Sequence, residues 1–152
     1  MKNYRDIKLA HEILQAGWAR LDEQWPILHP DDPKPFLSQV FRPAIVQAAY
    51  YAQGRKGLDE VNWLRKKADL APITAKENKS KVTHAPPGMS LHEQNPSRAF
   101  DIAFVKKGTK STLDWSEPLF RQAAVILKSF DTRIKWGGDW PDPKTDRPHF
   151  QC

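Results

Sequence analysis

The chain has 152 residues and a net charge of +6, from 24 basic and 18 acidic residues, which suits a single domain with a polyanionic partner such as nucleic acid, anionic lipid or bacterial cell wall. Its one cysteine, Cys152, excludes an internal disulfide and a thiolate-rich zinc cluster. No apolar run approaches the ~18 residues of a membrane helix, and the N-terminus has no secretory h-region. We therefore expect a soluble monomer, released into the cytoplasm that made it, without stable membrane association. The basic residues are mostly scattered and no nucleic-acid recognition motif is present, so nucleic acid is not the expected partner.

The first half of the chain predicts helices around one strand. Apolar residues at helical spacing from Ile7 predict a helix that stops before the loop at 25–35, where four prolines exclude regular structure. Further on, alternation predicts a strand and apolar periodicity predicts two helices, over residues 36–41, 44–53 and 58–70. Pro43 opens the first of these two helices and Gly54 ends it.

The second half predicts most of the sheet. Residues 71–88 are polar and proline-rich and predict an irregular excursion with a short strand at 81–83. Residues 99–105 are apolar except at Asp101 and predict a central strand. A helix follows with Asp114 and Glu117 spaced as a capping box, and the last strands are expected over 133–136 and 149–151. The fold class predicted is α+β, a single domain over 1–152 with a small, mostly antiparallel sheet and packed helices.

Two short segments far apart in the chain hold candidate metal ligands. The first is Ser90-Leu91-His92 followed by Ala99-Phe100-Asp101, and the second runs from Trp136-Gly137-Gly138-Asp139-Trp140 to Asp146-Arg147-Pro148-His149-Phe150. A catalytic zinc site needs three protein ligands and a base beside the metal-bound water. Two imidazoles and a carboxylate supply the ligands here, and the second carboxylate, three residues before the last histidine, supplies the base. Each of these residues also has an interpretation that involves no metal. His92 would then be a surface histidine, Asp101 an ion-pair partner of Arg98 or a lysine, and Asp146 a turn residue.

Taken together, these motifs resemble the VanY-like zinc peptidases, which comprise D-alanyl-D-alanine carboxypeptidases and the L-alanyl-D-glutamate endopeptidases used as bacteriophage endolysins. Two upstream segments add to the resemblance: Phe41-Arg42-Pro43 with Gln47, and Tyr51-Ala52-Gln53-Gly54-Arg55. The likeness spans residues 36–55 and 81–151. The Tyr-Ala-Gln-Gly-Arg and Trp-Gly-Gly-Asp-Trp runs point towards the endolysin branch.

The resemblance implies a role for each site residue. Zinc would be bound by His92, Asp101 and His149, with Asp146 as general base. Arg42 would hold a substrate carboxylate or stabilise the oxyanion. We expect Ser90 to support the His92 loop on the substrate side of the site, and Gln47 to be a structural contact near Arg42.

The spacing of the first segment departs from the family. Eight residues separate His92 from Asp101 where the family usually has six, and Ser97 stands where a glycine is expected. The extra residues can bulge outward as a loop. Glu93 then becomes a possible substitute ligand.

The resemblance implies a zinc metallopeptidase that hydrolyses the L-alanyl-D-glutamate bond of the peptidoglycan stem peptide. As an endolysin it would accumulate in the host cytoplasm and act on the cell wall once the membrane is permeabilised. One alternative is a D,D-carboxypeptidase that releases terminal D-alanine. Another is a non-catalytic cell-wall-binding module, which would need no stoichiometric zinc.

Overall fold

A computed structural model describes residues 3–152, so the first two residues of the N-terminal stretch considered above lie outside it. Contacts within the chain divide it into two compact units. The sheet unit consists of the residues up to Phe41 together with Asn95–Cys152, and the α2–α3 unit consists of Arg42–Gln94. The prediction that the whole chain makes a single catalytic domain stays a prediction.

The sheet unit is built on an antiparallel sheet of four strands in the order β1-β2-β4-β3. The strands are β1 (Phe36–Gln39), β2 (Ala99–Ala103), β3 (Lys135–Trp136) and β4 (His149–Gln151). The predicted strand at 99–105 is indeed internal, and it pairs with β1 on one side and with β4 on the other. The α+β class with a small antiparallel sheet is therefore confirmed.

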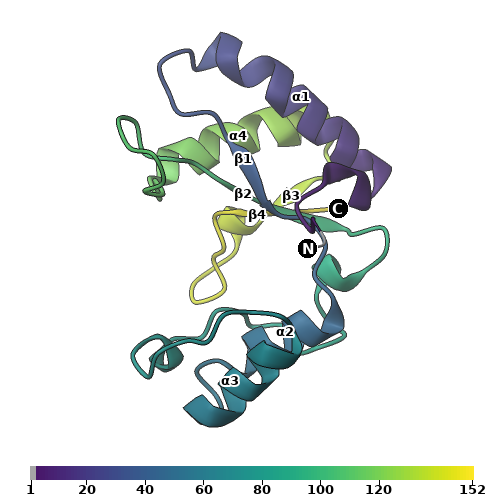
Figure 1. Ribbon diagram of the computed structural model, residues 1–152. Helices are drawn as coiled ribbons and strands as arrows, with labels where there is room; N and C mark the ends of the chain where they lie inside the picture. Colours follow the sequence, from purple (N-terminus) through teal and green to yellow (C-terminus); the bar gives the residue numbers. More distant parts are fainter. Residues whose placement is uncertain (1–2) are drawn as a thin grey trace. The chain divides into compact units, whose positions relative to one another are not determined.

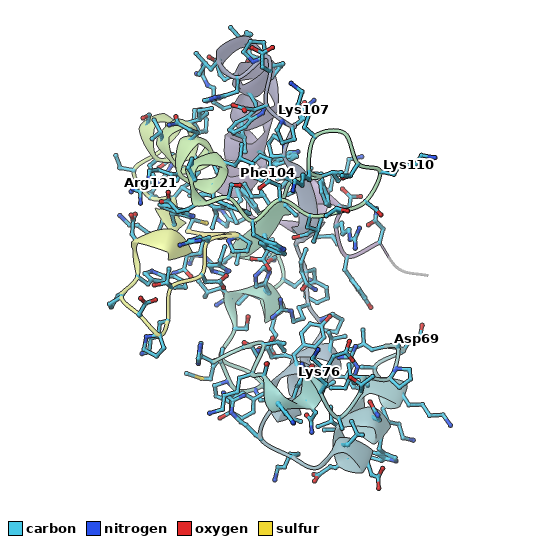
Figure 2. The ribbon with its side chains drawn as sticks, turned by 90° about the vertical axis from the view of Figure 1, so that its left-hand side faces the viewer. Asp69, Lys76, Phe104, Lys107, Lys110 and Arg121 are labelled. Atoms are coloured by element: carbon cyan, nitrogen blue, oxygen red, sulfur yellow. The ribbon has the colours of Figure 1, made fainter. Side chains whose placement is uncertain are left out.

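Two helices, α1 (Glu12–Leu28) and α4 (Glu117–Phe130), contact each other and supply most of the helical residues of the core (Figure 1). Side chains alternate along a strand, so Phe100 and Ile102 share one face of β2, where they join this core. Phe150 of β4 stacks on Phe100 with ring centroids 5.7 Å apart. Phe104 lies among these core side chains, whereas Lys107 and Lys110 lie on the exposed loop that follows (Figure 2). One face of the sheet therefore packs against the core.

The first helix differs from its predicted bounds. Residues Ile7–Leu9 form a short 3-10 turn (η1), and α1 begins later because Nδ1 of His11 accepts a hydrogen bond from the amide of Ile13 at 3.2 Å. The helix also continues through Pro26. Trp25 is buried and packs on Phe104, a contact that outweighs the one backbone hydrogen bond that a proline forfeits.

The start of α4 shows a second difference. Ser116 is the N-cap residue and makes no side-chain capping bond, so the predicted capping box of Asp114 and Glu117 is wrong. The carboxylate of Asp114 instead accepts a hydrogen bond from the amide of Ser116 at 2.9 Å, which closes the turn before the helix. Pro118 does occupy the first turn, as predicted.

The other unit contains α2 (Ala44–Ala52) and α3 (Leu58–Lys67), close to their predicted bounds, and they contact each other. The predicted strand at 81–83 does not form. The side chain of Gln53 donates to the carbonyls of Glu77 and Ser80, and that of Arg55 donates to the carbonyl of Thr83. Glu77 belongs to a 3-10 turn before this segment (η2, Glu77–Lys79). None of the helices in the described part of the chain has the length and hydrophobicity to span a bilayer.

Candidate metal centre

Asp101 and His149 face each other across the pair of strands β2 and β4. The antiparallel register places the two residues opposite each other, and Nδ1 of His149 lies 3.2 Å from Oδ1 of Asp101. His149 is 8% exposed and Asp101 is half-buried. Phe100, Ile102 and Phe150 point to the opposite, core face. The strand alternation thus keeps the carboxylate out of the core, and the ordinary interpretation of Asp101 as a partner of Arg98 is not needed.

The electrostatics of His149 favour positive charge beside Asp101. Burial lowers the pKa of His149, but the hydrogen bond and the charge of Asp101 more than offset it. Gln151 and Asp146 contribute in the same direction, and the net pKa lies above the ordinary value. A proton or a metal cation therefore stabilises this pair.

Gln151 is a site residue that the sequence interpretation missed. Its Oε1 lies 2.9 Å from Nε2 of His149, so both ring nitrogens have a partner in the sheet unit. The available signal was its position two residues after His149 on the same strand, which puts both side chains on one face.

A turn of the sheet unit holds Asp146 close to β3. The 3-10 turn η4 (Gly137–Asp139) follows β3, and the amide of Asp146 donates to the carbonyl of Gly137 at 2.9 Å. A Cβ at position 137 would lie 2.2 Å from the carbonyl oxygen of Asp146, so this approach requires glycine. The Asp146 side chain is exposed, and the amide of His149 donates to the Asp146 carbonyl at 3.2 Å.

The tryptophans of the Trp-Gly-Gly-Asp-Trp run have identifiable tasks. Nε1 of Trp136 donates to the carbonyl of Arg147 at 2.7 Å, and the Trp140 ring lies 5.3 Å from the His149 imidazole. Asp139 forms an ion pair with Lys128 at 2.5 Å. The run thus shapes the segment that leads to His149.

His92 lies in a 3-10 turn, η3 (Leu91–Glu93), and is 3% exposed. Ser90 caps this turn, its Oγ accepting from the His92 amide at 3.3 Å. The carboxylate of Glu93 accepts from the amides of Gly88 and Ser90 and completes a capping box. Glu93 is therefore used to hold the loop, and this argues against it as a substitute ligand.

The α2–α3 unit also fixes Arg42 beside the His92 loop. The amide of Arg42 donates to the carbonyl of His92 at 2.8 Å, and its Nη1 donates to Oε1 of Gln47 at 2.8 Å. Gln47 is fully buried, and its Nε2 donates to the Ala85 carbonyl at 2.7 Å and to Thr83 at 3.2 Å. Gln47 is therefore a structural contact of Arg42, as predicted.

Two of the three candidate ligands, Asp101 and His149, come together within the sheet unit. His92 belongs to the α2–α3 unit, and its part in a shared site stays a prediction. Two imidazoles and a carboxylate are a donor set that zinc accepts in catalytic sites, where a fourth position stays open for water or substrate. The chemistry of the donors thus fits zinc. The roles of Asp146, Arg42 and Ser90 remain predictions.

Comparison with known proteins gives two structural likenesses. The chain is similar to the L-Ala D-Glu endopeptidase ChiX of Serratia marcescens, with 15% identity and a TM-score of 0.48, over 95% of this chain and 81% of that one. It is also similar to the vancomycin-resistance D,D-pentapeptidase VanY in complex with Zn(II), with 18% identity and a TM-score of 0.45, over 90% of this chain and 70% of that one. No family model and no curated protein matches. At these values neither likeness decides what this chain does.

Proposed function

We propose that this chain is a zinc-dependent peptidase that cuts the L-alanyl-D-glutamate bond in the stem peptide of bacterial peptidoglycan. The observation that carries the proposal is the pair of Asp101 and His149, held 3.2 Å apart across β2 and β4. The motif resemblance implies both as zinc ligands, with His92 as the third. The positive net charge of +6 suits an anionic cell wall.

Each candidate site residue has a defined role in the proposed reaction. His92, Asp101 and His149 would hold zinc, which when bound polarises the scissile carbonyl and acidifies water. The Asp146 carboxylate accepts a proton from the attacking water and passes it to the leaving amine as the C–N bond breaks. The Arg42 guanidinium, oriented by Gln47, donates hydrogen bonds to the developing oxyanion or to a substrate carboxylate. The products are a new alanine carboxylate and a new N-terminal D-glutamate.

We further propose that the protein acts as an endolysin, made in the host cytoplasm and active on the wall after the membrane is permeabilised. This rests on the endolysin-like runs at 51–55 and 136–140.

Digestion of purified peptidoglycan, with and without a chelator, tests the proposal when the released termini are identified by mass spectrometry. We expect new N-terminal D-glutamate, lost on chelation and restored by zinc. Free D-alanine would instead assign a D,D-carboxypeptidase. No cleavage by folded, zinc-loaded protein would indicate a wall-binding module.

Variants at the candidate site are compared with variants of exposed residues of the same type. His149→Ala should abolish cleavage, whereas His84→Ala, at an exposed histidine, should retain it. Asp146→Asn should lose cleavage but keep zinc, whereas Asp142→Asn, at an exposed carboxylate of the same loop, should behave as wild type. Full activity of His149→Ala would contradict the proposal.

A further inference from the structure

We propose that Gln151 is a positioning residue that selects the metal-binding form of His149. The inference rests on the proposed function, because it concerns the same site. Oε1 of Gln151 lies 2.9 Å from Nε2 of His149 and can only accept a hydrogen there, so a metal ion can replace the hydrogen on the Nδ1 that faces Asp101.

The hydrogen count of a neutral imidazole decides which ring nitrogen can bind a metal. Such a ring carries one N–H, so a hydrogen on Nε2 leaves Nδ1 as a lone-pair donor. Nδ1 and Oδ1 of Asp101 are then two electron-pair donors 3.2 Å apart, and only a shared cation makes their approach favourable. The opposite tautomer would use the Nδ1–H to bond Asp101 and would remove Nδ1 as a ligand. The acceptor at Nε2 therefore decides whether His149 can bind metal beside Asp101.

The surroundings of Gln151 leave its amide to this task. The cross-strand neighbour in β2 is Ala99, which has no polar side-chain atom. The neighbour in β3 is Lys135, whose Nζ donates to the carbonyl of Thr132 at 3.0 Å. The Trp140 ring lies 5.3 Å from the His149 imidazole, centroid to centroid. His149 and Gln151 lie on the same face of one short strand, so the contact is built into β4.

The test measures zinc affinity by competition with a chromophoric chelator. Gln151→Met keeps the length of the side chain but removes the acceptor, and we expect zinc to bind about 10–100-fold more weakly. Gln151→Glu keeps an acceptor and should bind zinc close to the wild-type affinity. Gln94→Met is the matched control, because Gln94 is exposed and also follows a candidate ligand histidine by two residues. If Gln151→Met does not fold, Gln151→Lys replaces the acceptor with a donor and should weaken binding in the same way.

A second readout needs no zinc. Long-range ¹H–¹⁵N NMR spectra of the metal-free protein, recorded where the His149 ring carries both hydrogens, report whether the Nε2–H is hydrogen-bonded. We expect a bonded Nε2–H in the wild type and its loss in Gln151→Met. Equal zinc affinity and an unchanged Nε2–H signal in this variant would overturn the inference. A wild-type protein that binds no zinc would instead contradict the proposed function, while the Nε2–H signal would still show whether Gln151 holds the ring.

Discussion

Replacement of Gly137 by alanine should both destabilise the protein and displace Asp146. The added Cβ would stand 2.2 Å from the carbonyl oxygen of Asp146, so the two segments must separate by about 0.8 Å to reach the 3.0 Å that real Cβ atoms keep. Overpacking of this kind costs about 1–3 kcal/mol. For a chain of this size such a loss lowers Tm by roughly 2–12 °C. The same movement breaks or lengthens the 2.9 Å hydrogen bond between the Asp146 amide and the Gly137 carbonyl.

The catalytic effect should be larger than the effect on zinc binding. A reacting group misplaced by ~1 Å costs about 100-fold in rate, whereas the ligands on β2 and β4 stay in their strands. Thermal unfolding, zinc competition and peptidoglycan digestion measure the three quantities. Gly57→Ala is the control, because its Cβ would meet nothing within 4 Å and φ at this residue is −62°. An unchanged Tm in Gly137→Ala would refute the packing argument, and a lower Tm with full activity would refute the placement of Asp146 in the reaction.

Three further predictions concern the sheet unit. Ser97→Ala removes a buried hydroxyl that donates to the Val40 carbonyl at 2.8 Å, and urea unfolding should show a loss of about 0.5–1.5 kcal/mol; no loss would contradict this bond. Phe100→Ala should cost about 3–5 kcal/mol in the same assay, whereas Trp63→Ala, at a 59% exposed ring, should cost far less. Arg133 holds the pKa of Asp131 at about 2 through hydrogen bonds, so the carboxyl ¹³C titration should move back towards 3.8 in Arg133→Gln. Because the folded pKa is lowered, the stability that this contact contributes is present above pH 3.8 and is lost as the pH falls towards 2; an unshifted midpoint in the variant would contradict the assignment.

The sequence was informative where a local pattern determines the outcome. The apolar run at 99–105 predicted a central strand, and β2 does lie between β1 and β4. The proline and glycine signals at Pro43 and Gly54 marked α2 to within a residue, and Gly54 adopts a positive φ of 78° that favours glycine. Such features depend on neighbours in the chain.

The misses arose where a distant contact overrides a local rule. Proline normally ends a helix, but the burial of Trp25 against Phe104 carries α1 past Pro26. Thr83 was expected in a strand, but its carbonyl is bonded by the Arg55 guanidinium at 3.0 Å. The Tyr-Ala-Gln-Gly-Arg run therefore holds the loop that precedes the His92 turn. No local pattern in the sequence predicts this contact.

The register between β2 and β4 decides whether the candidate site exists at all. With Phe100 opposite Phe150, Asp101 stands opposite His149 and the aromatic rings share the core face. A slip of one residue would turn Asp101 into the core and expose Phe100, and a buried unpaired carboxylate costs several kcal/mol. The core that stabilises the sheet therefore also enforces the pairing of the two candidate ligands. Core substitutions that shift β4 should reduce metal affinity without touching a ligand, because the same backbone register serves both faces.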